Sequence, residues 1–153
     1  MTASVELKWK KLHSGAELPR YGTTGAACFD LCAALDTDMV LKPGEINIVP
    51  TGLACEIPSG FEMQVRGRSG LAAKFGLSLV NGIGTIDADY RGEIRAIVIV
   101  HGKEPLIVRH GDRIAQAMIS PVLTVTHVQT QELSDTLRGE KGFGSTGVSK
   151  GNL

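Results

Sequence analysis

The stretch IRAIVIV, residues 94–100, is the most β-branched run in the sequence and indicates a buried strand. Residues 61–66 alternate apolar and polar side chains, which is typical of a strand with one buried face. Residues 114–119 and 122–128 form two further apolar runs, which Pro121 separates. Because these runs are short and closely spaced, the sequence predicts an all-β fold, a barrel or sandwich of jelly-roll type.

The rest of the chain adds little helix to this pattern. Residues 5–10 alternate as a strand does, and residues 18–25 (LPRYGTTG) have the composition of a loop. Residues 71–75 (LAAKF) are compatible with about one helical turn. From residue 134 onward the sequence is polar and glycine-rich, so we predict one domain over residues 1–134 and a flexible tail over residues 135–153.

Composition limits the kind of protein. Sixteen Lys and Arg residues balance sixteen Asp and Glu residues, which argues against a nucleic-acid-binding surface. No apolar stretch approaches the length of a membrane span, and the first residues lack an apolar signal core. Cys28, Cys32 and Cys55 form no CxxC pair, and the four histidines are scattered. We therefore expect a cytoplasmic protein with reduced thiols and no structural zinc site.

The segment GTIDADYRG, residues 84–92, places two carboxylates two positions apart between glycines. On a hairpin arm Asp87 and Asp89 share a face, and Tyr90 lies beside them. One interpretation is a carboxylate base at the mouth of a hairpin, with an aromatic wall. The other is an acidic β-turn, since Asp and Gly are common turn residues, and spacing alone favours this second interpretation.

The segment VRGRSGL, residues 65–71, combines a guanidinium, a hydroxyl and an unhindered amide at Arg68, Ser69 and Gly70. These groups suit phosphate oxygens, so the segment is a candidate phosphate-binding loop. A basic loop between two strands is the alternative.

The tail segment RGEKGFGSTG, residues 138–147, contains a GxGxxG match. A dinucleotide-binding fingerprint has to follow a strand and open a helix, which this position at the end of the chain does not allow. Phe143 is the large apolar residue here, and a planar base would suit it. The segment is thus either a mobile anion-binding strip or a tail with an incidental Phe. The strip would consist of Arg138, the amides around Gly144, and the hydroxyls of Ser145 and Thr146.

The segment GDRIAQ, residues 111–116, offers two features. Asp112 and Arg113 are expected to pair with each other locally. Gln116 is polar within an apolar strand, so it needs a hydrogen-bonding partner. No Ser-His-Asp or Cys-His arrangement is apparent, which disfavours covalent catalysis.

Taken in order, five segments resemble the motifs of the trimeric deoxyuridine triphosphate nucleotidohydrolases (dUTPases). The similarity runs from about Leu18 to Gly147, and five motifs in the right order are specific. The segments are FDL (29–31), RSGL (68–71), GTIDADYRG (84–92), GDRIAQ (111–116) and RGEKGFGSTG (138–147).

The resemblance implies a small distorted β-barrel of the dUTPase-like or β-clip kind, assembled as a homotrimer whose active sites each draw on three subunits. It implies hydrolysis of dUTP to dUMP and pyrophosphate, which lowers dUTP and supplies dUMP for thymidylate synthesis. The tail would close over the nucleotide, and Mg²⁺ would be held mainly by the phosphates, in line with its reluctance to lose water.

The resemblance also implies a role for individual residues. Asp87 would activate the water that attacks the α-phosphorus, and Asp30 would reach Mg²⁺ through water. Tyr90 would pack beneath the sugar, and Phe143 would stack on uracil. The other substrate contacts implied are Arg68, Ser69, Gly70, Asn81, Gly84, Thr85, Ile86, Arg95, Gln116, Arg138, Gly144, Ser145 and Thr146.

Two other functions compete with this one. A dCTP deaminase of the same fold family would need a catalytic glutamate in the core, and the TIDADYRG and GFGSTG segments favour the hydrolase. A non-enzymatic, nucleotide-responsive interaction module is the second rival, and the presence of Asp87 argues against it as the sole function. Cys28 and Gly67 stand where the family often has Gly and Pro, and neither residue carries chemistry.

Overall fold

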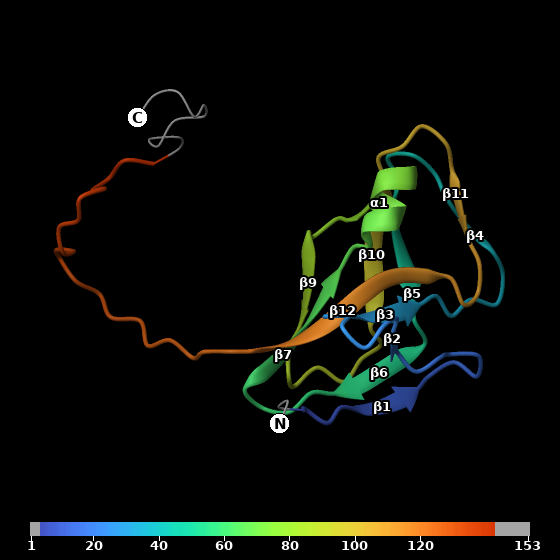
Figure 1. The fold of residues 1–153 in the computed structure, drawn as a ribbon, viewed down its shortest axis with the longest axis horizontal. Coiled ribbons are helices and arrows are strands. Elements are labelled where there is room, and N and C mark those ends of the chain that lie inside the picture. The colour runs from blue at the N-terminus through green and yellow to red at the C-terminus, as the bar shows by residue number, and fades with distance from the viewer. Residues whose placement is uncertain (1–3, 143–153) are drawn as a thin grey trace. The chain divides into compact units, whose positions relative to one another are not determined.

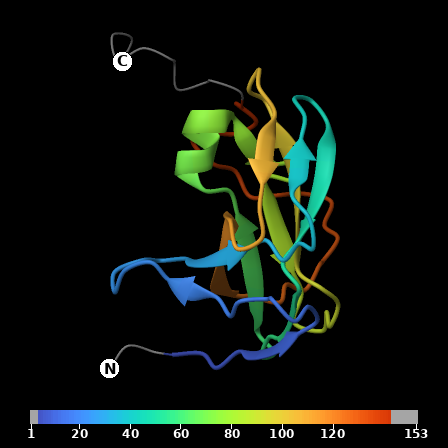
Figure 2. The ribbon, with the colours of Figure 1, turned by 90° about the vertical axis from the view of Figure 1, so that its right-hand side faces the viewer.

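The computed structural model describes residues 4–142, and it is dominated by strands with one short helix (Figures 1 and 2). No helix among these residues is long and apolar enough to cross a membrane. The elements, in chain order, are β1 (Lys8–Lys11), β2 (Arg20–Tyr21), β3 (Phe29–Cys32), β4 (Met39–Leu41), β5 (Ile46–Pro50), β6 (Leu53–Glu56), β7 (Phe61–Arg66), α1 (Ser69–Phe75), β8 (Leu77–Leu79), β9 (Ile83–Ile86), β10 (Arg95–Val100), β11 (Leu106–Val108) and β12 (Arg113–Pro121).

The largest sheet has five strands in the order β2-β3-β12-β7-β9, and all its neighbours are antiparallel. Three smaller sheets pair β5-β10-β8, β1-β6 and β11-β4. The helix α1 lies at one end of the strand unit and the β1–β6 pair at the other (Figures 1 and 2). The prediction of an all-β fold is therefore confirmed, whereas closure of the sheets into one barrel stays a prediction.

The decisive run of the sequence forms β10, but only one of its faces is buried. Ala96, Val98 and Val100 point into the core, and Ile97 lies on the exposed face. The β-branched residues thus mark a strand correctly, while alternation decides which of them are buried. The core that β10 joins draws on most of the strands; its largest fully buried side chains include Leu31, Leu41, Met63, Val49, Val98, Val100, Ile94 and Ile114.

The helix predicted near residues 71–75 is present as α1. It begins after Arg68, whose backbone is extended, and ends at Gly76, which has a left-handed φ of 68°. A Cβ at Gly76 would also lie 2.6 Å from the backbone nitrogen of Gly102, so glycine is required there on both counts.

The strand predicted over residues 122–128 is wrong. β12 continues through Pro121 and ends there, and the following residues carry no strand. Val125 and Val128 are 66% and 81% exposed, because this run has no neighbouring strand to pair with in the part of the chain described. The contacts between residues divide the chain into two units, and the second begins at Thr124. The described part of this second unit, to residue 142, contains no helix or strand. The tail predicted from residue 135 falls within this unit.

A pH-dependent contribution to stability is expected from Cys55, on β6. Burial raises the pKa of this thiol from the ordinary value of 9.0 to about 11, and the Arg91 guanidinium opposes the shift. Above pH 9 the thiol of an unfolded chain ionises while the folded one stays neutral. The contribution is thus complete below pH 9 and is lost as the pH rises through about 11. Denaturant unfolding of the wild type and of Cys55→Ala should show a difference in free energy that shrinks between pH 9 and 11. A constant difference would contradict this account.

Candidate active site

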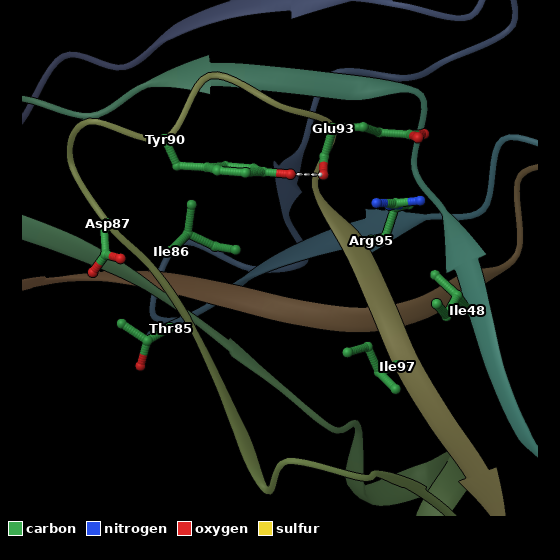
Figure 3. Close-up of a pocket in the computed structure, with 8 residues that line it drawn as sticks. All are labelled: Ile48, Thr85, Ile86, Asp87, Tyr90, Glu93, Arg95 and Ile97. Carbon is green, nitrogen blue, oxygen red and sulfur yellow. Dashed lines mark hydrogen bonds between the residues drawn. The ribbon is translucent and has the colours of Figure 1, made fainter.

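The loop that connects β9 to β10, named the Asp87 loop, joins strands of two different sheets. It carries Asp87 and borders a cavity of about 270 Å³ (Figure 3). The polar groups of its lining come from this loop and the adjoining strand ends, and its apolar groups come from the end of β9 and the exposed faces of β5 and β10. The lining residues are Ile48, Thr85, Ile86, Asp87, Tyr90, Glu93, Arg95 and Ile97. The structure thus brings five sequence-predicted site residues together: Thr85, Ile86, Asp87, Tyr90 and Arg95.

Hydrogen bonds within the loop fix its shape. The amide of Tyr90 donates to the carbonyl of Asp87 over 3.1 Å, which closes a turn. The Arg91 guanidinium donates to the carbonyls of Ala88 and Tyr90 at 2.6 and 2.9 Å. A Cβ at Gly92 would lie 2.4 Å from the Tyr90 hydroxyl oxygen, so glycine lets the ring lie against the backbone. The acidic turn is therefore present and Asp87 lines the cavity, but the flanking strands β9 and β10 belong to different sheets and form no hairpin.

A second cavity, of about 400 Å³, lies beside the start of α1 and carries the basic groups. Its lining residues are Gly22, Thr23, Ala26, Cys28, Asp30, Arg68, Ser69, Gly70, Leu71, Lys74, Phe75, Arg113 and Gln116. It contains Asp30, Arg68, Ser69, Gly70 and Gln116, five further residues that the sequence predicted.

Asp30 is held between two guanidinium groups in this cavity. Its carboxylate lies 3.0 Å from Nε of Arg68 and 3.3 Å from Nη1 of Arg113, and the Asp30 side chain is 18% exposed. The local pair expected between Asp112 and Arg113 is therefore wrong. Asp112 instead accepts a hydrogen bond from the amide of Arg109 over 2.7 Å, in the turn that precedes β12.

Two hydrogen bonds attach the Arg68 loop to β12. Gln116 donates from Nε2 to the carbonyl of Gly67 over 2.8 Å, which supplies the partner that this polar residue was predicted to need. Arg68 donates from Nη1 to the carbonyl of Arg113 over 3.1 Å. These contacts hold a fork of donors toward the cavity, an arrangement that suits phosphate oxygens.

The two cavities share no lining residue. Both border the five-stranded sheet, in which three strand spacings separate β9 from β3. At about 4.8 Å per spacing, Thr85 and Asp30 are about 14 Å apart measured across the sheet. One chain therefore presents two separate cavities, one with a carboxylate and an aromatic ring, the other with arginines.

The remaining predicted residues lie elsewhere. Asn81 and Gly84 flank or belong to β9 without lining either cavity, and the Asn81 Nδ2 atom lies 3.3 Å from the position a Cβ of Gly84 would take. Arg138 donates from Nε to the carbonyl of Lys141 over 2.9 Å, within the tail. Phe143, Gly144, Ser145 and Thr146 lie outside the described residues.

Several contributors to the cavities were missed. Arg113 was assigned a local partner, and its pair with Asp30 spans 83 residues. Ile48 and Ile97 line the first cavity, and the signal that could have found them is a strand with apolar residues on both faces. Glu93 gave no such signal, because its contacts depend on a distant loop.

The residues present fit a Mg²⁺ ion held mainly by a substrate. Residues 4–142 contain no group of three His, Cys, Asp or Glu side chains that could cage a metal. Asp30 is a single carboxylate already paired with two arginines, which suits a contact through water better than direct ligation.

An all-β domain with an acidic loop and an arginine-lined cavity has the features of a hydrolase for a small anionic substrate. The dUTPase family model matches residues 14–147. A deoxyuridine 5'-triphosphate nucleotidohydrolase of Helicobacter hepaticus is 51% identical over 98% of this chain and 94% of its own length. One of Desulfotalea psychrophila is 53% identical over 97% of this chain and 100% of its own length. The chain belongs to the dUTPase family.

A solved structure agrees with this assignment. The dUTPase of Staphylococcus bacteriophage 80alpha with dUPNHPP superposes with a TM-score of 0.81, at 28% identity, over 94% of this chain and 99% of the phage chain. The sequence-based resemblance to dUTPases is thereby confirmed.

Arg113 is expected to contribute to anion binding. Arg113→Ala removes one of the two guanidiniums beside Asp30, and a charge-assisted hydrogen bond contributes about 1.5–3 kcal/mol. Calorimetry should therefore show an affinity for pyrophosphate about 10- to 100-fold lower than that of the wild type. Arg109→Ala is the control, because Arg109 pairs with Asp38 and lines neither cavity. Equal affinities for the two variants would show that Arg113 does not bind the anion.

Proposed function

We propose that this chain hydrolyses dUTP to dUMP and pyrophosphate. The relatives above carry the name deoxyuridine 5'-triphosphate nucleotidohydrolase, and the phage protein was solved with dUPNHPP. The observation that carries the proposal is the division of labour between the two cavities. The cavity beside Asp87 offers a carboxylate and an aromatic ring, and the second cavity offers donors for phosphate.

Asp87 is the proposed general base. Its carboxylate orients a water molecule and takes its proton while the water attacks the α-phosphorus in line, with pyrophosphate as the leaving group. The position supports this role, because Asp87 follows β9 directly and a closed turn holds it at the edge of the cavity. General-base help of this kind contributes about 10²–10⁴-fold to the rate.

Arg68, Ser69, Gly70 and Gln116 are the proposed contacts to the phosphates. Phosphoryl transfer depends on positioning and on charge neutralisation more than on covalent help, and guanidinium groups supply both. Mg²⁺, when bound by the phosphates, would add charge neutralisation, and Asp30 would contact it through water. Asp30 also keeps Arg68 and Arg113 in place before any nucleotide arrives.

The strand β9 and the loops on either side of it are the proposed recognition element for uracil and deoxyribose. Their main chain at Asn81, Gly84, Thr85 and Ile86 would take the place of a pairing partner for the base, as would the main chain of Arg95. The Tyr90 ring would lie beneath the sugar and leave no room for a 2′-hydroxyl. The hydroxyl end of the ring lies where a Cβ of Gly92 would be, so glycine makes room for it, which supports this assignment.

A homotrimer with shared active sites is the proposed assembly. The two cavities of one chain share no lining residue and lie about 14 Å apart measured across the sheet, so each would be completed by the other cavity of another chain. Ile46 and Ile48 on β5 are 62% and 50% exposed, beside Ile97 on β10, and this apolar face suits contact with a second copy. Burial of such a face would stabilise the assembly.

The tail is the proposed lid. Phe143 would stack on uracil, and the γ-phosphate would be held by Arg138, Gly144, Ser145 and Thr146. Closure would exclude water from the site and complete it. In the cell the reaction would lower dUTP and supply dUMP for thymidylate synthesis. The three free cysteines are consistent with the cytoplasm as the proposed location.

The direct test is release of pyrophosphate from dUTP in the presence of Mg²⁺, beside UTP, dCTP and dTTP. The proposal requires turnover of dUTP well above the other three. Release of ammonia from dCTP would support the deaminase instead, and binding without turnover would support an interaction module.

Asp87→Asn should lower kcat by about 10²–10⁴-fold, because the amide cannot accept the proton of the attacking water. Affinity for dUPNHPP should stay within about threefold of the wild type, since the same shape remains and ground-state contacts are kept. Asp89→Asn is the matched control, two residues further along the same loop and outside the cavity lining. A wild-type-like kcat for Asp87→Asn, or an equal loss for Asp89→Asn, would refute the assignment.

A further inference from the structure

The Asp87 loop ends near Glu93, a residue whose side chain has no role in the proposed chemistry. Glu93 precedes β10 and lines the same cavity as Asp87. Its main-chain carbonyl accepts a hydrogen bond from the Tyr90 hydroxyl over 3.0 Å. Figure 3 shows the Tyr90 phenol reaching toward this carbonyl, with the Glu93 carboxylate extending away from Asp87. The ring of Tyr90 is therefore tethered at its far end to the backbone of Glu93.

The Glu93 carboxylate is itself attached to a distant loop. Its Oε1 atom accepts a hydrogen bond from the amide of Gly52 over 2.8 Å, across 41 residues of sequence. Two further bonds join the same segments: the buried hydroxyl of Thr51 donates to the carbonyl of Ile94 over 2.6 Å, and the amide of Ile94 donates to the carbonyl of Leu53 over 2.8 Å. Of the three bonds, only the Glu93 bond depends on a side chain of the loop.

The anchor at Gly52 cannot easily move. Gly52 has a left-handed φ of 64°, and a Cβ there would lie 2.6 Å from Cβ of His13 and 2.9 Å from Cβ of Ala34. Its carbonyl also accepts hydrogen bonds from the amides of Leu12 and His13. The amide that Glu93 contacts is thus held by packing and by hydrogen bonds on the other side of its own residue.

We propose that Glu93 is a positioning residue for sugar selection: its carboxylate fixes the end of the Asp87 loop to Gly52, and thereby holds the Tyr90 ring where it excludes a ribose. The inference rests on the proposed hydrolysis of dUTP and adds the residue that sets its selectivity. Asp87 is carried by the other end of the loop, where Ile86 pairs with Met63 of β7. Loss of the Glu93 contact should therefore affect sugar selectivity more than kcat.

The experiment compares kcat and KM for dUTP and UTP in four proteins: wild type, Glu93→Ala, Glu93→Gln and Glu104→Ala. Glu93→Ala should lower the ratio of kcat/KM for dUTP to that for UTP about 10-fold, the size expected for one lost charge-assisted hydrogen bond, with kcat for dUTP within about threefold. Glu93→Gln keeps an acceptor for the Gly52 amide and should restore most of the ratio. Glu104→Ala, the same change on an exposed loop, should match the wild type.

A double-mutant cycle separates positioning from a general loss of stability. Tyr90→Phe removes the hydroxyl that bonds to Glu93 and should lower the same ratio, and Glu93→Ala added to it should cause little further loss. Glu93→Asp, with a carboxylate one methylene shorter, should resemble Glu93→Ala and gives a second variant should the first not fold. Multiplicative losses in the cycle, an unchanged ratio in Glu93→Ala and Glu93→Asp, or no rescue by Gln would each overturn the proposal.

The proposed function is judged separately in the same set. Pyrophosphate release from dUTP by the wild type and by Glu104→Ala tests hydrolysis without reference to Glu93. Calorimetric affinities for dUPNHPP and its ribose counterpart measure sugar selectivity without turnover. A wild type that prefers the deoxy compound, with a Glu93→Ala variant that does not, would support the role of Glu93 even if hydrolysis failed.

Discussion

The antiparallel pairing of β7 with β12 on one side and β9 on the other is the constraint on which the candidate site depends. Val65 pairs with Ala117 and with Gly84, so a single register positions both neighbours of β7. A slip of one residue would turn every side chain of the strand to the opposite face. The buried Met63 and Val65 oppose such a slip, because it would expose them to water.

Each functional segment leaves this sheet at a fixed point. The Arg68 loop follows β7, the Asp87 loop follows β9, and Gln116 lies within β12 next to Asp30 on β3. The polar contacts then refine positions that the strands have already set. The Asp30 carboxylate between two guanidiniums is the main example: its side chain is only 18% exposed, so removal of both partners would leave a mostly buried charge without compensation.

The sequence was sufficient for features that depend on neighbours along the chain. Alternation located β7, the β-branched run located β10, the LAAKF segment located α1, and the single segment GTIDADYRG contains both Asp87 and Tyr90, which line one cavity. It was insufficient for contacts between distant segments. The Arg113–Asp30 pair spans 83 residues and the Glu93–Gly52 bond spans 41, and no local pattern encodes either. The apolar run at residues 122–128 misled for a related reason, since its composition suits a strand but the described residues offer it no partner.

The central claim is that an active site combines the Asp87 loop of one chain with the arginine cavity of another. The most direct measurement mixes two inactive variants, Asp87→Asn and Arg68→Ala, after joint unfolding and refolding, and records dUTP hydrolysis. In shared sites, an intact Asp87 and an intact Arg68 meet with probability one half times one half, so about a quarter of the wild-type activity should return at equal amounts. If each site were built within one chain, every site would carry a defect, and the mixture would stay as inactive as its components.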